Sequence, residues 1–119
     1  MNVAQLIAEI KTKQSYLCVG LDTDITKLPD GITKDATGIL QFNKEIIDAT
    51  KDFAVSYKIN TAFYEQLGSE GWRVLEKTRE LIPSNILSIA DAKRGDIGNT
   101  STMYAKAFFE TMDFDALTV

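Results

Sequence analysis

The sequence has 119 residues, of which 45% are apolar and 25% charged, a composition typical of one ordered globular domain. Its 13 basic and 17 acidic residues give a net charge of -4 without a basic cluster, so binding to nucleic acid or to a membrane surface is not predicted. One cysteine and no histidine exclude an intrachain disulfide and a Ser-His-Asp or Cys-His catalytic arrangement, and they disfavour a zinc site. No signal peptide and no run of about 20 apolar residues is recognisable, so a cytoplasmic protein is expected.

Two hydrophobic patterns alternate along the chain. Apolar residues at helical spacing predict helices at residues 2–13, 34–51, 61–82 and 98–112. Apolar runs without alternation predict strands, buried on both faces, at residues 16–22, 53–59, 85–91 and 114–119. The third helix is expected to break near Gly68 and Gly71. Side chains expected in the core include Tyr16, Cys18, Trp72 and Phe108.

Alternating helices and strands predict an α/β fold with a parallel sheet and right-handed crossovers. Two architectures fit this order, an open doubly wound sheet and part of a (β/α)₈ TIM barrel, and periodicity does not separate them. A complete barrel has about 250 residues, and this chain supplies roughly half of that length. A final buried strand with no helix after it favours a single domain, residues 1–119, that forms the first four β/α units of a barrel.

Charged residues stand at the ends of three predicted strands. Asp22 ends the first strand, Lys58 lies in the second, and Asp91 ends the third, with Lys93 and Asp96 just beyond it. The active sites of parallel α/β folds lie at the carboxyl ends of the strands. A lysine in an apolar strand is costly unless it is paired. An alternating array of Lys and Asp, in which each charge has a partner, is therefore predicted at this end of the sheet.

Each of these residues also has a purely structural explanation. A single Lys or Asp at a strand end is commonly a solvated loop residue. Asp96 is suited to cap the helix that begins near Gly98, Asp24 to form a turn, and Arg94 to lie on the surface. Charged groups at three successive strand ends nevertheless favour a functional site.

Residues 89–100, with the sequence IADAKRGDIGNT, resemble the signature of the orotidine 5′-phosphate decarboxylase family, Asp-x-Lys-x-x-Asp-Ile-x-x-Thr. The DAKRGDI segment, residues 91–97, resembles the form of this signature in one branch of the family that is best represented in bacteria. The segments VGLD at residues 19–22 and YKIN at residues 57–60 agree in order and spacing, and the similarity runs along essentially the whole chain. The resemblance implies a (β/α)₈ barrel enzyme that converts orotidine 5′-phosphate to UMP in pyrimidine biosynthesis without a metal or a cofactor.

The resemblance also implies catalytic roles. Lys93 would be the proton donor, and Lys58, Asp91 and Asp96 would complete a charged tetrad with it. The family's phosphate-binding loops follow later strands, which this sequence does not contain.

Further residues would bind the substrate by the same resemblance. Asp22 and Lys58 would contact the ribose hydroxyls. Asp96, Ile97 and Thr100 would reach across the interface of a homodimer into the partner's site.

Two alternatives remain open at this point. Relatives in the same superfamily, such as 3-hexulose-6-phosphate synthase and 3-keto-gulonate-phosphate decarboxylase, use magnesium and need an acidic ligand at the second strand. This chain has Lys58 there, which favours the orotidine 5′-phosphate hypothesis. The alternative from another class is a non-catalytic half-barrel or dimerising module.

Overall fold

The computed structural model describes all 119 residues. Four parallel strands form one sheet in the order β1-β2-β3-β4. These strands are β1 (Leu17–Gly20), β2 (Ala54–Asn60), β3 (Leu87–Asp91) and β4 (Ala116–Leu117). The strand order follows the chain order without a reversal, whereas a doubly wound sheet reverses at its switch point. The topology is therefore that of a barrel.

One helix precedes the first strand, and the others connect consecutive strands. The helices are α1 (Val3–Lys13), η1 (Ile25–Lys27), α2 (Ala36–Thr50), α3 (Ala62–Glu65), α4 (Gly68–Leu81), α5 (Gly98–Ala105) and η2 (Lys106–Thr111), the last wound as a π-helix. α1 begins where it does because Asn2 and Gln5 form a reciprocal capping box. None of the helices is long and apolar enough to cross a bilayer.

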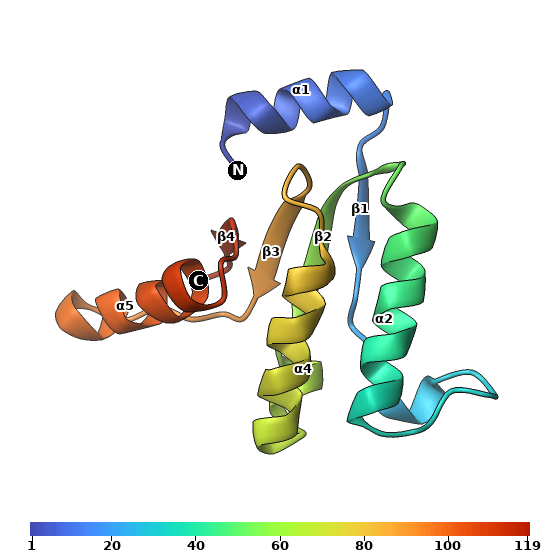
Figure 1. Ribbon diagram of the computed structural model, residues 1–119. Helices are drawn as coiled ribbons and strands as arrows, with labels where there is room; N and C mark the ends of the chain where they lie inside the picture. The colour runs from blue at the N-terminus through green and yellow to red at the C-terminus, as the bar shows by residue number, and fades with distance from the viewer.

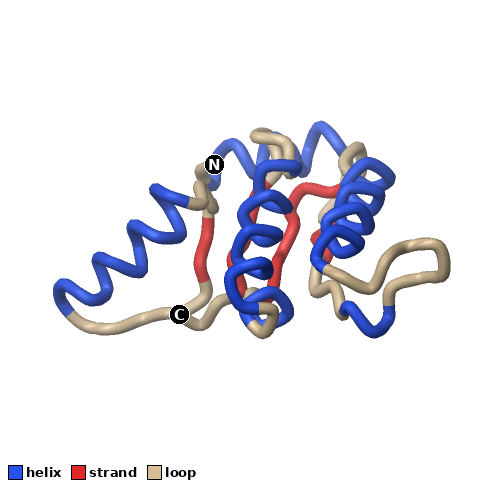
Figure 2. The backbone as a smooth tube through the Cα atoms, turned by 60° about the horizontal axis from the view of Figure 1, so that its bottom comes forward, coloured by secondary structure: helices blue, strands red, loops and turns tan.

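The molecule is a slab of two layers with extents of 40 × 40 × 17 Å. α2 and α4 lie side by side against one face of the sheet, and α1 crosses the end at which the strands begin (Figure 1). Seen from below, the same two helices stand in front of the strands (Figure 2). Because these helices cover only one face, the other face of β2 and β3 carries Lys58 and Asp91 together with the partly exposed Leu87 and Ile89.

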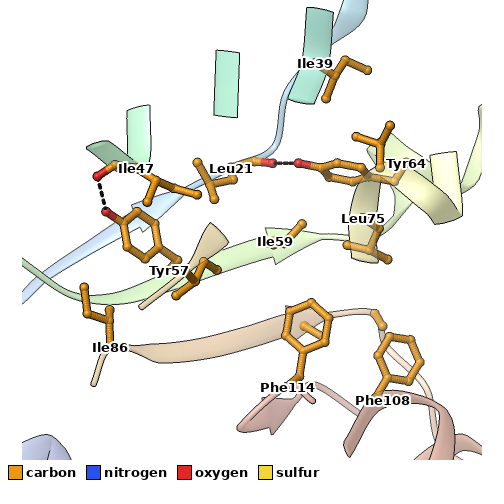
Figure 3. Packing of buried hydrophobic residues seen from close by; sticks show 14 of the residues in the cluster. Leu21, Ile39, Ile47, Tyr57, Ile59, Tyr64, Leu75, Ile86, Phe108 and Phe114 are labelled. Atoms are coloured by element: carbon orange, nitrogen blue, oxygen red, sulfur yellow. Dashed lines mark hydrogen bonds between the residues drawn. The ribbon is translucent and has the colours of Figure 1, made fainter. Parts of the chain in front are cut away.

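The core lies between the sheet and the helices. Tyr57 and Ile59 of β2 are fully buried, and they face Ile39 and Ile47 of α2 (Figure 3). The Tyr57 hydroxyl donates to the carbonyl of Ile47, which satisfies its polar end. Residues 58 and 60 alternate with these positions, so Lys58 points to the opposite face of the strand.

Three core predictions were wrong. Tyr16 is 85% exposed, and Cys18 is exposed as well. Both belong to the edge of the sheet, where β1 pairs only with β2 and has no neighbour on its other side. Trp72 of α4 is 38% exposed, although its ring packs against Phe108, which is buried as predicted.

The predicted long third helix breaks at one glycine but not at the other. Gly68 has φ +63° and starts α4, so the interruption falls just before it. Gly71 lies inside α4, where a Cβ would come 1.7 Å from the carbonyl oxygen of Tyr64. This glycine therefore permits close packing of α4 on α3.

Candidate functional site

A row of alternating charges crosses the carboxyl ends of β1, β2 and β3. Lys58 Nζ lies 2.6 Å from Asp22 Oδ2 and 3.8 Å from Asp91 Oδ2. Lys93 Nζ lies 2.6 Å from Asp91 Oδ1. We call Asp22, Lys58, Asp91 and Lys93 the charged row. Each carboxylate in it lies beside at least one ammonium group, so the charges offset one another.

Strand register explains why these side chains meet. Lys58 is aligned with Gly20 of β1 and Ile89 of β3, and Asn60 is aligned with Asp91. Alternate residues share one face of a strand, so Lys58 and Asp91 lie on the face that α2 and α4 leave uncovered.

Asp22 is held by the backbone and by a buried polar network. Its Oδ1 accepts from Asn60 N at 3.0 Å. The carbonyl of Leu21, one residue earlier, accepts from the Tyr64 hydroxyl at 2.7 Å, and Thr23, one residue later, donates to Asn43 at 2.5 Å. Both neighbours of Asp22 are therefore fixed.

Asn43 is the centre of this network. Its amide donates to the Tyr64 hydroxyl at 2.8 Å and to Thr78 Oγ1 at 2.9 Å, and it is fully buried. Burial raises the pKa of Tyr64 to about 12, so this hydroxyl stays protonated and able to donate. The network joins α2, α3 and α4 to the loop that carries Asp22.

Asp91 and Lys93 differ in exposure. The side chain of Asp91 is 19% exposed and that of Lys93 is 64% exposed. Hydrogen bonds from Lys93 and Thr118, with the charge of Lys58 nearby, hold the pKa of Asp91 below its usual value. Asp91 is thus ionised at neutral pH, and the ammonium of Lys93 reaches toward open solvent.

Lys93 has an unusual backbone conformation. Its φ is +51°, in the left-handed region that costs a non-glycine residue about 1 kcal/mol or more. Such strain persists where surrounding contacts hold it, and it is concentrated at functional sites.

Asp96, Ile97 and Thr100 lie outside the charged row. Residues 95–100 are all exposed, and Ile97 is 86% exposed. Asp96 Oδ1 accepts from Ile97 N at 2.7 Å, and Asp96 forms no ion pair. Asp96 does not cap α5 either, because the N-cap residue is Ile97 and has no side-chain bond. The structure therefore brings three members of the predicted tetrad together and leaves Asp96 apart.

Sequence reasoning missed the contacts of three residues at the site, Thr118, Asn60 and Arg94. Thr118, the residue after β4, donates to Asp91, and the backbone N–H of Asn60 donates to Asp22. Arg94, expected on the surface, pairs with Glu65 at 2.6 Å and donates to the carbonyl of Ala92 at 2.7 Å. A signal existed for Thr118, because a hydroxyl ends a predicted strand whose neighbouring strands also end in polar groups.

Asp24 forms the predicted turn, as the N-cap of η1. No three acidic or thiol side chains converge in a group able to hold a metal ion.

Comparison with known proteins decides the family. A family model described as the orotidine 5′-phosphate decarboxylase / HUMPS family matches residues 15–119. The chain belongs to this family. An orotidine 5′-phosphate decarboxylase of Bacteroides fragilis (strain YCH46) is 55% identical over 122 residues, covering 100% of this chain and 44% of the relative. One from Flavobacterium johnsoniae is also 55% identical, covering 100% of this chain and 45% of that protein.

A solved structure supports the same conclusion for the fold of this decarboxylase-family chain. OMP decarboxylase of Leishmania donovani superposes with a TM-score of 0.80 at 36% identity, over 96% of this chain and 42% of that one. The predicted fold class is confirmed: the chain forms the first part of a (β/α)₈ barrel. It spans less than half the length of the relatives that it matches.

Proposed function

We propose that the protein containing this chain decarboxylates orotidine 5′-phosphate to UMP, without a metal or a cofactor, as a step of pyrimidine biosynthesis in the cytoplasm. The observation that carries the proposal is the charged row, in which the exposed ammonium of Lys93 is held beside the ionised Asp91. Relatives at 55% identity that bear the decarboxylase name support it.

Lys93 is the proposed proton donor. Loss of CO₂ from C6 of the pyrimidine leaves an electron pair in the ring plane, where the π system cannot absorb it. An ammonium beside C6 stabilises that charge and then delivers a proton to the carbon. Asp91, 2.6 Å from this ammonium, orients the Lys93 side chain.

The remaining members of the charged row are proposed to bind the substrate and to assist the loss of CO₂. Asp91 lies close to the substrate carboxylate in this proposal, so repulsion favours the departure of CO₂. Asp22 and Lys58, joined at 2.6 Å, contact the ribose hydroxyls. Their pairing places a hydrogen-bond acceptor and a hydrogen-bond donor side by side, as two neighbouring hydroxyls require.

Asp96, Ile97 and Thr100 are proposed to complete the site of a second subunit. Their exposure is consistent with this, because all three side chains, including the 86% exposed Ile97, are accessible to a second subunit. Mixing an Asp96→Ala protein with a Lys93→Ala protein should restore some activity, since one site of the heterodimer then has both residues. Proven heterodimers without activity would argue against a shared site.

The magnesium-dependent alternative has a weaker basis in this chain. β2 carries Lys58 where those enzymes need an acidic ligand, and its Nζ occupies the space beside Asp22. The non-catalytic alternative applies to the 119 residues by themselves, because they span less than half of the relatives' length. Exposed apolar residues at the β1 edge, Tyr16, Leu17 and Phe53, favour association of this part with further structure.

The test is ultraviolet-monitored turnover of orotidine 5′-phosphate, with and without a chelator, by the 119-residue chain and by the complete product of its gene. Chelator-insensitive turnover by the complete product is the expected result. Turnover that magnesium restores after chelation would favour the sugar-phosphate class instead, and the absence of any turnover would refute the proposed activity.

A further inference from the structure

We propose that Thr118 is a positioning residue of the active site, which orients Asp91 and fixes the backbone of Lys93 at the same time. The inference rests on the proposed function, because it concerns the two residues to which the proton transfer is assigned. Thr118 itself does not touch the reacting atoms in this proposal.

Thr118 makes four hydrogen bonds, all to β3 or to the loop after it. Its Oγ1 donates to Asp91 Oδ1 at 2.9 Å and accepts from Lys93 N at 3.1 Å. Its own N donates to the carbonyl of Ala90 at 3.0 Å, and its carbonyl accepts from Arg94 N at 3.1 Å. Thr118, the residue after β4, therefore binds four of the five residues from Ala90 to Arg94, all except Ala92.

The bonds on either side of Lys93 account for its strained backbone. The N–H of Lys93 donates to the Thr118 hydroxyl, and the N–H of Arg94 donates to the Thr118 carbonyl. These two contacts hold the φ of Lys93 at +51°, which turns the chain so that the ammonium returns to Asp91. Without the hydroxyl, the left-handed conformation loses one of its two anchors.

The same hydroxyl acts on the carboxylate. Asp91 contacts Lys93 from the loop after β3, Lys58 from β2 and Thr118 from the residue after β4. Asp22 pairs with the same Lys58 ammonium. Lys93 Nζ and Thr118 Oγ1 both bind Oδ1, whereas Oδ2 faces Lys58. The hydroxyl therefore fixes which oxygen each lysine addresses.

The deciding experiment compares Thr118→Val with Thr118→Ser in the active protein. Valine has nearly the shape of threonine and lacks the hydroxyl, whereas serine keeps it. For Thr118→Val we expect kcat to fall about 10- to 100-fold, with KM changed about twofold or less, because misplacement of catalytic groups affects the chemical step. The acid limb of the pH–rate profile should move to higher pH, since the carboxylate loses a hydrogen bond that favours its ionised form. Thr118→Ser should keep kcat within about threefold of the parent.

Ser88→Ala is the matched control. Ser88 Oγ donates to the carboxylate of Asp115 at 2.8 Å, which is the same kind of bond at the other end of β3. This variant should lose stability as Thr118→Val does, but it should keep kcat and the pH profile. An equal loss of kcat in Ser88→Ala would mean that any weakened bond between β3 and β4 lowers activity, and it would overturn the positioning role. So would a Thr118→Ser protein as slow as Thr118→Val.

A readout without turnover separates this inference from the proposed function. The Asp91 carboxyl pKa, followed by carbon NMR, should be higher in Thr118→Val than in the parent and in Thr118→Ser. An unchanged Asp91 pKa would overturn the inference even if the parent decarboxylates orotidine 5′-phosphate. A raised pKa in a protein whose parent shows no turnover would overturn the proposed function and uphold the contact assigned to Thr118.

Discussion

Asp91 and Asp115 are bound in nearly the same way at opposite ends of the same two strands. Asp91 ends β3, and Asp115 precedes β4. Each accepts from the hydroxyl of the other strand, Thr118 for Asp91 and Ser88 for Asp115, and each pairs with an ammonium group. The side chains are similarly covered, with 19% of Asp91 and 13% of Asp115 exposed.

The two carboxylates differ in what else holds them. Asp115 accepts from the backbone N of Ser88 at 2.9 Å, and its ammonium partner is the N-terminus of Met1, whose side chain is 3% exposed. Asp91 has no backbone donor, and one of its lysines is 64% exposed. The comparison shows that a backbone donor and the terminal ammonium fix Asp115 between the strands, whereas Asp91 is held by side chains alone, one of them largely exposed. This division matches the two faces of a parallel barrel, one for stability and one for chemistry.

The largest expected effect is on Lys93. Lys93→Ala should lower kcat by about 100- to 10,000-fold, because it removes the proposed proton donor, while the urea midpoint changes little. Turnover of orotidine 5′-phosphate and urea denaturation are the two measurements. Activity within a few-fold of the parent would remove Lys93 from the mechanism.

The next effect is on stability. Asp115→Ala should lower the free energy of unfolding by about 2–3 kcal/mol, because buried donors of Ser88 lose their charged acceptor. Asp113→Asn is the control: its ion pair with Arg79 is at the surface, with 87% of the Asp113 side chain exposed, and should be worth less than about 1 kcal/mol. If urea denaturation gave the same loss of unfolding free energy for both variants, the covered carboxylate of Asp115 would be no more important to stability than the exposed one of Asp113. Asp115→Ala should leave the kcat of the remaining folded protein unchanged.

A smaller effect separates strain from side-chain chemistry at position 93. Lys93→Gly should be more stable than Lys93→Ala by up to about 1 kcal/mol, because glycine adopts a positive φ without a steric penalty. Both variants should be equally inactive. If alanine were the more stable of the two in urea denaturation, the left-handed backbone of Lys93 would not be a cost to the fold.

The smallest expected effect is on the acid dependence of stability. Burial acts to raise the pKa of Asp115, but hydrogen bonds from the Met1 ammonium and from Ser88 outweigh it and lower the pKa below its usual value. The folded state then binds fewer protons than the unfolded state, so stability is present above the unfolded pKa of about 4 and is lost as the pH falls through the folded pKa. Asp115→Asn cannot titrate, and its unfolding free energy should depend less on pH between about pH 5 and pH 2. Identical slopes in urea denaturation across this range would show that Asp115 does not contribute.

The alternation of helices and strands was predictable because it depends on local periodicity. The meeting of Asp22, Lys58, Asp91 and Lys93 was predictable for a similar reason, since the carboxyl ends of parallel strands share one edge. Exposure was less predictable. Tyr16 looks like a core residue by type, but its burial depends on which strand lies beside β1.

The contacts of Thr118 could not be derived from pattern alone. The apolar run at residues 114–119 predicts a strand, but only the register of β3 with β4 brings this hydroxyl to Asp91. The left-handed φ of Lys93 has no signal in the sequence either, because lysine is not typical of that region. The separation of Asp96 from the charged row was not predictable either, because Asp96 lies in an exposed loop beyond the strand end, where register does not fix its position.

Gly71 limits how this sequence can vary over evolutionary time. Any side chain there would collide with the carbonyl of Tyr64, whose hydroxyl holds Leu21 just before Asp22. Gly20 and Gly31 have open space where a Cβ would lie, although the φ of +91° at Gly31 adds a conformational restriction there. A substitution at position 71 would therefore displace Tyr64, and with it the backbone that places Asp22 at the end of β1. A saturation library selected for growth without pyrimidines should retain glycine at 71 more strictly than at position 20.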